Sequence, residues 1–177
     1  MTPSLFKAEW STLLILSTIV LSIVLLTASF FLLKTFSVPA TGTRIMGVLV
    51  LITLFVTMIL SYLLSPQGYS IGEESLTIVR QLKPITIPLV DITEVEGPTP
   101  GLTYGSIRLL GNDGLWGRYG KYQSARLGPY YLYVRSGKNP VLVQGPQKYV
   151  VGPERPQEFV KTLNQAIAAA KARRNVK

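Results

Sequence analysis

The distribution of apolar and polar residues divides the chain into two unlike parts. Residues 11–33 and 45–64 contain no charged side chain and consist mainly of apolar residues, Thr and Ser. At about 1.5 Å per helical residue, either run makes a rod of roughly 30 Å, the thickness of a bilayer's hydrocarbon core. The alternative is a pair of buried helices in a larger soluble protein, which needs more surrounding chain than these 177 residues provide. The pattern therefore predicts two transmembrane helices.

The segments beside these runs predict how the helices are connected. Residues 34–44 form a short polar turn with a basic residue at each end, so the two helices make an antiparallel hairpin. Both ends of the chain then lie on the same side of the membrane. Residues 1–10 are a short polar lead. Trp10, Tyr62 and Tyr69 are expected at the membrane interface, where Trp and Tyr are enriched.

The basic residues near the membrane ends do not decide the orientation of this hairpin. Lys34 and Arg44 lie at the turn, whereas Lys7, Arg80 and Lys83 lie nearest the membrane on the other side. Counted by the positive-inside rule, the two sides nearly balance.

From residue 65 onward, short runs of alternating apolar and polar residues are separated by turn residues. This pattern predicts strands at 69–72, 76–80, 85–89, 91–96, 106–110, 130–135, 141–144 and 148–151. Residues 97–105 form a loop, and the sequence Gly-Asn-Asp-Gly at 111–114 predicts a tight turn. The pattern is that of a mainly-β domain over residues 65–172, with a helix in its C-terminal part.

One amphipathic helix follows these strands, from about residue 155, because prolines suit a helix start. Its apolar residues fall on one stripe: Phe159, Val160, Leu163, Ala166, Ile167 and Ala170. Residues 173–177 make a basic tail. Short strands closed by one such helix form a barrel or sandwich that the helix plugs.

The composition excludes several kinds of chemistry. The chain has no Cys and no His, which rules out thiol nucleophiles, Ser–His–Asp triads and zinc sites built from those ligands. The main carboxylates of the domain lie on or beside alternating strands without an acid–base partner: Glu73, Glu74, Asp91, Glu94 and Glu96. We therefore assign no catalytic, cofactor-binding or metal-binding residue and expect no enzymatic activity.

The most distinctive stretch of the domain is the glycine-rich region 115–128, which mixes aromatic and basic residues. Trp, Tyr and Arg are enriched at the hot spots of protein interfaces, and the same residue types bind lipid headgroups or nucleic acid. The alternative is that Trp116 and some tyrosines pack inside the domain while the charges stay in water. The candidate partner or lipid surface comprises Trp116, Arg118, Tyr119, Lys121, Tyr122 and Arg126, with Arg80 and Lys83 in an earlier turn.

Several short motifs, in their order and spacing, carry a family resemblance. They are LTIVR at 76–80, KP at 83–84, IPLVDI at 87–92, GNDGLWG at 111–117, GKY at 120–122, YVVGP at 149–153 and EFV at 158–160. Residues 69–168 thereby resemble the bacterial pleckstrin-homology-like (bacterial PH) domains that follow transmembrane helices.

The resemblance implies a fold of seven antiparallel strands in two orthogonal sheets, capped by a C-terminal helix. It implies a binding and oligomerisation module and carries over no catalytic residue. It also implies an integral protein of the bacterial inner (plasma) membrane, with the N-terminus and the domain in the cytoplasm. In the phosphoinositide-binding relatives, basic residues near Arg80 and Lys83 hold phosphates, but residues 85–89 supply no further cation.

Together these observations predict a membrane-anchored, non-enzymatic scaffold that holds a partner complex or self-assembles at the membrane surface. The expected partners are the lipid bilayer and either a membrane protein or a second copy of the chain. The net charge of +9 favours anionic partners, but tethering to a membrane argues against nucleic acid. One alternative is a sensor of anionic lipid headgroups, and another is an uncharacterised membrane-bound enzyme.

Overall fold

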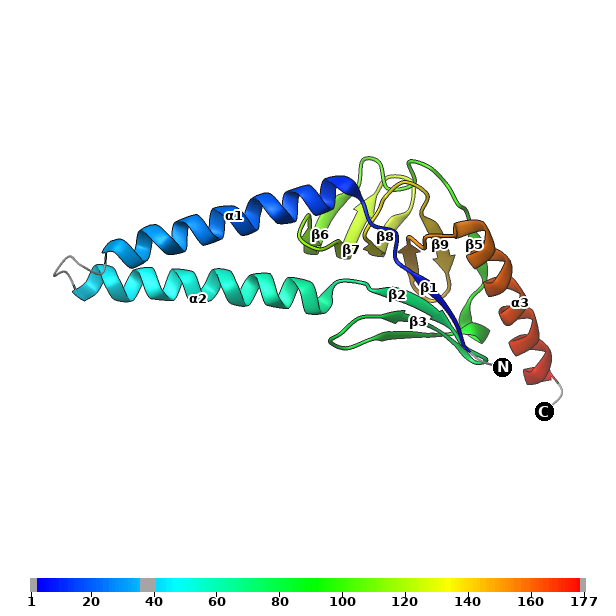
Figure 1. Ribbon diagram of the computed structural model, residues 1–177. Helices are drawn as coiled ribbons and strands as arrows, with labels where there is room; N and C mark the ends of the chain where they lie inside the picture. The colour runs from blue at the N-terminus through cyan, green and yellow to red at the C-terminus, as the bar shows by residue number, and fades with distance from the viewer. Residues whose placement is uncertain (1–2, 36–40, 176–177) are drawn as a thin grey trace.

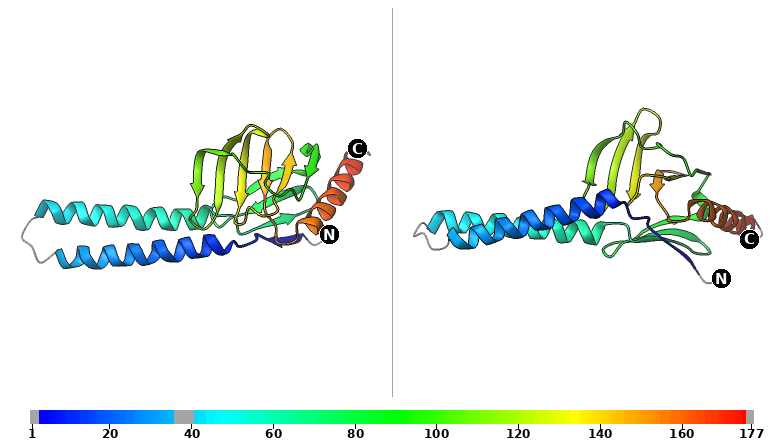
Figure 2. Two further views of the ribbon diagram at one scale, coloured as in Figure 1. Left: turned by 90° about the horizontal axis from the view of Figure 1, so that it is seen from above. Right: turned by 45° about the horizontal axis from the view of Figure 1, so that its top comes forward.

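A computed structural model describes residues 3–35 and 41–175 of the chain (Figure 1). These residues form three α-helices and ten β-strands. The helices α1 (Thr12–Thr35) and α2 (Thr41–Leu64) run antiparallel beside each other and project from a β-rich domain (Figures 1 and 2). The first α-helix therefore ends and the second begins inside the predicted turn at 34–44, of which residues 36–40 lie outside the described residues.

Both projecting helices are long and apolar enough to cross a membrane, over Thr12–Leu32 and Ile45–Leu64. Few residues of either segment are buried, which distinguishes them from the core helices of a soluble protein. Hydroxyl side chains in these helices donate hydrogen bonds to the backbone of their own helix. For example, Thr18 Oγ1 donates to the Leu14 carbonyl at 2.8 Å. The chain thus carries two candidate membrane-spanning helices.

The smaller sheet of the domain contains a strand from before the first helix. Its strands are all antiparallel, in the order β1 (Ser4–Lys7), β2 (Gly68–Ile71), β3 (Ser75–Val79) and β4 (Ile85–Pro88). The N-terminal lead therefore has a structure that the sequence did not predict. β1 pairs with β2 in the register Phe6↔Tyr69, although both helices lie between these two strands in the sequence.

The larger sheet has six strands in the order β5 (Glu94–Glu96), β9 (Val141–Gln144), β10 (Lys148–Val151), β8 (Gly128–Val134), β7 (Arg118–Ser124) and β6 (Ile107–Asp113). Adjacent strands of this sheet are antiparallel, except that β8 and β10 pair in parallel. The prediction of about seven antiparallel strands closing a barrel was therefore wrong. Among the described residues an isolated antiparallel bridge between Ala8, next to β1, and Pro153, next to β10, links the two sheets, but no ladder of paired strands joins them and the barrel is not closed.

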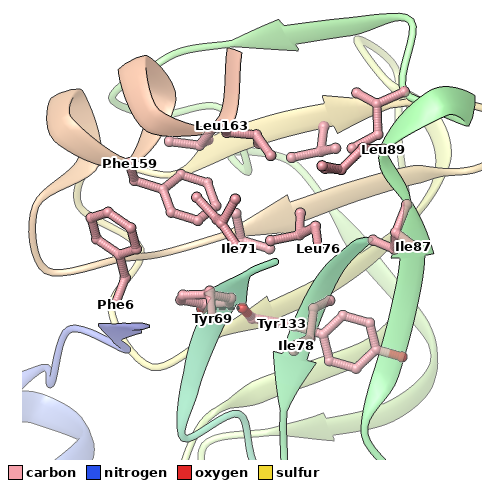
Figure 3. Packing of buried hydrophobic residues seen from close by; sticks show 14 of the residues in the cluster. Phe6, Tyr69, Ile71, Leu76, Ile78, Ile87, Leu89, Tyr133, Phe159 and Leu163 are labelled. Atoms are coloured by element: carbon pink, nitrogen blue, oxygen red, sulfur yellow. Dashed lines mark hydrogen bonds between the residues drawn. The ribbon is translucent and has the colours of Figure 1, made fainter. Parts of the chain in front are cut away.

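The main hydrophobic core lies between the two sheets and beneath the C-terminal helix α3 (Pro156–Asn175), as Figure 3 shows. Phe159, Leu163 and Ile167 enter this core from one stripe of α3, which confirms the predicted helix. The helix continues through Arg173 and Arg174, where a separate tail was predicted, and residues 176–177 lie outside the described residues.

Two local predictions are corrected by the packing. Tyr69 does not lie at a membrane interface: it is fully buried, and its hydroxyl donates to the Tyr133 carbonyl at 2.7 Å and accepts from the Gly152 N–H at 3.0 Å. Burial raises the pKa of Tyr69. The predicted turn at 111–114 lies too early, because β6 continues to Asp113 and turns only at residues 114–117. A short 3₁₀ helix, η1 (Leu89–Asp91), separates β4 from β5.

Candidate functional site

The turn between β6 and β7 lies against the domain ends of both projecting helices. Ser17 Oγ of α1 donates to the Gly114 carbonyl at 3.2 Å. The Trp116 ring meets the Tyr62 ring of α2 edge to face, with 5.1 Å between their centroids. Trp116 has a φ of 59°, which few residues other than Gly adopt, and this backbone lets the turn fit beside the helices. The most prominent residue of the predicted surface therefore contacts the protein's own helices.

Ser65, just after α2, links this turn to the rest of the domain. Its hydroxyl donates to the Trp116 carbonyl at 2.6 Å and accepts from Arg135 Nε at 3.3 Å. The Arg135 guanidinium lies over the Trp10 ring, 4.1 Å from its centroid. Arg135 is buried, and the loss of water lowers its pKa from the ordinary arginine value. The face of Trp10 compensates part of this desolvation.

Tyr119 makes a further connection to the helices. Its side chain is buried in the main core, and its hydroxyl donates to the Ser61 carbonyl near the end of α2 at 3.0 Å. Burial raises its pKa. We call Trp10, Ser65, Trp116, Tyr119 and Arg135 the junction cluster, because together they tie both helices to the larger sheet. Of its members, sequence reasoning assigned only Trp116 and Tyr119 to a site.

An apolar groove of about 670 Å³ opens beside the junction cluster. It runs along α1 and is lined by Trp10, Ile15, Thr18, Ile19, Ser22, Ile23, Leu26 and Trp116. The buried Nε1 of Trp116 has no hydrogen-bond partner among the residues that the structure describes. Most of this lining belongs to the Thr12–Leu32 segment, so the groove lies along a helix that is apolar enough to cross a membrane.

Tyr122 points to the opposite face of the larger sheet from Tyr119. It is fully buried in a second cluster, is stacked with Tyr130 at 6.1 Å, and donates to the Asn112 carbonyl at 3.0 Å. Burial, followed by the nearby Asp113 carboxylate, raises the pKa of Tyr122 to about 12. The sheet therefore separates two aromatic residues that the sequence placed on one surface.

The basic residues of the predicted surface also disperse over the domain. Arg118 forms an ion pair with Asp113 at 2.7 Å, and Arg126 with Glu96 at 3.1 Å. Lys121 is exposed. It lines a shallow hollow of about 370 Å³ together with Pro129, Tyr130, Tyr131, Gly145, Pro146, Gln147 and Lys148. These cations do not converge on one phosphate-sized site.

Arg80 and Lys83 lie in the turn between β3 and β4, which folds against the end of α2. The N–H of Leu82 donates to the Leu63 carbonyl at 2.9 Å. Arg80 donates to the Lys83 carbonyl, and its guanidinium lies 5.4 Å from the centre of the Tyr133 ring. Lys83 is exposed. The Lys83 side chain therefore lies in solvent, whereas the Arg80 side chain contacts the domain itself.

A further hollow lies between the β2–β3 turn, β4 and the end of α3, the helix at the end of the domain away from the helix pair in Figure 1. This distal groove has a volume of about 950 Å³ and is lined by Glu73, Glu74, Ser75, Thr86, Pro88, Val90, Ala170, Ala172, Arg173 and Arg174. Arg173 crosses it to form an ion pair with the Glu73 carboxylate at 2.9 Å. The lining thus combines apolar groups with charged side chains of both signs. The sequence carried no signal for this groove, since its walls come from distant segments.

In the described residues, no group of three or more His, Cys, Asp or Glu side chains is placed to hold a metal ion. Residues 67–167 match the family model of the bacterial PH domain. Because this match covers more than half of the 177 residues, the chain belongs to the bacterial PH domain family. PH-like domains are in general non-enzymatic binding modules. No curated protein and no solved structure matches the chain.

Proposed function

We propose that this protein is a membrane-anchored scaffold, in which the two helices span the bacterial inner membrane and hold the PH domain in the cytoplasm. The observation that carries the proposal is the junction cluster. α1 follows a strand of the smaller sheet, α2 leads into the next strand, and Trp116 and Tyr119 contact the end of α2. A domain tied at so many points keeps one orientation toward the membrane, as a scaffold requires.

The distal groove is the surface that we assign to the partner. Four of its lining residues belong to the last turns of α3, which lies at the end of the domain away from the helices (Figure 1), and a partner in the aqueous compartment can reach that end. Its apolar floor supplies area for burial, and Glu74 and Arg174 at the rim supply charge for selectivity. The occupant is a membrane-protein partner or a second copy of this chain.

A photo-crosslinking amino acid at Ala172 or Thr86 of the full-length protein tests this assignment in living cells. Both positions are exposed and line the distal groove. We expect one discrete adduct from both, whose mass distinguishes a second copy from another protein. Lys161, exposed elsewhere on α3, is the control. No adduct, or the same products from Lys161, contradicts the proposal.

Sensing of anionic lipid headgroups is a second candidate, favoured by the turn that carries Lys83. This turn adjoins the end of α2 through the contact of Leu82 with Leu63. Lys83→Glu should reduce the preference of the reconstituted protein for anionic over neutral bilayers, since each cation near an anionic surface contributes about 1 kcal/mol. Because exposed charge is screened by salt, that preference should also fall as salt rises, whereas binding in the distal groove should resist salt.

A further inference from the structure

The outer strand of the larger sheet, β6, exposes apolar side chains along its length. The exposed fraction is 70% for Ile107, 52% for Leu109 and 74% for Leu110. Tyr104, in the preceding loop, is 86% exposed. Edge strands that face water usually carry charges or are covered, because a bare apolar edge promotes aggregation. This edge therefore requires a covering environment.

The position of β6 along the helix pair indicates what that environment is. The turn that follows β6 contacts α1 at Ser17, through the hydrogen bond to Gly114. Ser17 lies five residues beyond Thr12, the first residue of the candidate span, or roughly 7 to 8 Å along the helix axis. The end of β6 that carries Asp113 consequently lies level with the first turns of a helix suited to the bilayer.

The direction of β6 shows that the rest of this strand lies at the same level along the helix pair as its Asp113 end. In Figure 2, β6 is the strand of its sheet nearest the free end of the helix pair, and it runs across the helix axes. When the helices stand across a bilayer, such a strand lies along the membrane surface. Ile107 and Leu110 then lie at the same membrane surface as the turn at Gly114.

The backbone of β6 argues against its being covered by another strand. A register shift between Arg108 and Leu110 makes Leu109 an extra residue, a β-bulge that interrupts the ladder. Bulges are one of the ways in which proteins stop an edge from pairing with a further strand. A partner of this edge therefore contacts its apolar side chains and does not pair with its backbone.

The charges near the edge fit a lipid surface. Arg108 is exposed between Ile107 and Leu109, and Lys121 is exposed beside Leu110 on the neighbouring strand. Long cationic side chains can hold their stems against apolar groups while their charges reach the headgroups. In the described part of β6, the only carboxylate is Asp113, which is paired with Arg118.

We propose that β6 is a membrane-contacting edge: Ile107, Leu109 and Leu110 enter the interfacial layer of the bilayer on which the domain rests, and Arg108 and Lys121 contact its phosphates. This inference depends on the proposed anchoring by the helix pair. It adds a second contact with the bilayer, and that contact reinforces the orientation that the junction cluster gives to the domain and to the distal groove.

The test uses the full chain with a single cysteine, which is feasible because the sequence has none. Leu110→Cys and, independently, Ile107→Cys carry an environment-sensitive fluorophore in nanodiscs that hold one copy of the protein. Asn164→Cys, exposed on α3, is the matched control. We expect both β6 probes to emit at shorter wavelength than the control and to lose intensity when nitroxide-bearing lipids replace ordinary ones.

Other outcomes overturn the inference in distinguishable ways. If the protein embeds in the discs but the β6 probes behave like the Asn164 probe, the edge does not contact lipid, and the anchoring stands. If the probes are shielded only in discs with two copies and lipid does not quench them, a second copy covers the edge. If the protein does not embed at all, the proposed anchoring fails, and this inference fails with it.

Discussion

The rings of Phe6 and Phe159 meet edge to face with their centroids 5.3 Å apart and their planes at 90°. Phe6 precedes both projecting helices in the sequence, and Phe159 lies on the C-terminal helix. Both side chains are buried in the core between the sheets (Figure 3). The domain is therefore completed by the beginning of the chain, and a fragment that starts after α2 lacks the strand that carries Phe6.

Phe6→Ala should lower the free energy of unfolding of the domain by about 3 to 5 kcal/mol, the usual cost of removing a buried Phe side chain. Urea titration of the full-length protein in detergent, followed by near-UV circular dichroism, measures this change. Leu5→Ala is the matched control, since Leu5 lies on the same strand but is exposed. Equal effects of the two substitutions would show that β1 does not pack into the core.

Ser65→Ala should loosen the junction between the helices and the larger sheet. It removes a hydroxyl that accepts from Arg135 and donates to Trp116, so a buried guanidinium N–H and a carbonyl lose their partner. Each unsatisfied buried group costs about 1 to 3 kcal/mol. Hydrogen exchange in the turn at 114–117 should accelerate, whereas Ser70→Ala, in the middle of β2, should leave it unchanged. Unchanged exchange in the Ser65 variant would refute the role of this contact.

Gly120→Ala should destabilise the pairing of β6 with β7. Gly111 and Gly120 face each other across this ladder, and both have a φ of +126°. A Cβ atom at Gly120 would lie 2.1 Å from the Leu110 carbonyl oxygen, so the strands must separate. We expect a loss of about 2 to 3 kcal/mol. Gly137→Ala, where the nearest atom is 3.7 Å away, should be close to neutral. A neutral Gly120→Ala would contradict the close approach.

The stability of the domain should fall at alkaline pH in part because of Tyr122. Its pKa is about 12 in the folded protein against an ordinary value of 10.0, because burial disfavours the tyrosinate. A raised folded-state pKa gives stability that is fully present below pH 10 and is lost as the pH rises toward 12.

Tyr122→Phe should therefore flatten the decline of the urea midpoint over that pH range. Tyr104→Phe removes an exposed hydroxyl and is the control. An unchanged slope in the Tyr122 variant would mean that this tyrosine ionises as readily in the folded protein as in the unfolded one.

The helices of this protein could be predicted from the sequence, because their signals are local. Long uncharged runs and an apolar stripe of period 3.6 need no knowledge of the rest of the chain. β1 could not be predicted in this way: it has four residues, and its partner follows both helices. The sequence pattern predicted no strand at 118–124, where β7 lies, and Gly120 of this strand makes a close cross-strand contact that only the paired strand explains.

The sequence predicted that some residues of the candidate site make contacts, but not what they contact. The sequence singled out Trp116 and Tyr119, and both contact another surface, the end of the protein's own α2. Local sequence does not distinguish a contact within the chain from one with another molecule. Arg135 and Ser65 escaped notice because a single polar residue after a strand or helix carries no pattern. That the remaining residues form a surface for lipid or protein stays a prediction.

Labelling of single cysteines with a membrane-impermeant thiol reagent tests the proposed anchoring most directly. Gly42, in the first turn of α2, has open space around it, and Asn139 lies exposed in the domain. In intact bacterial spheroplasts, Gly42→Cys should be labelled, and Asn139→Cys should be labelled only after the membrane is opened. Labelling of Asn139→Cys in intact spheroplasts would contradict the cytoplasmic placement of the domain, and labelling of both positions from one side would contradict a membrane-spanning helix pair.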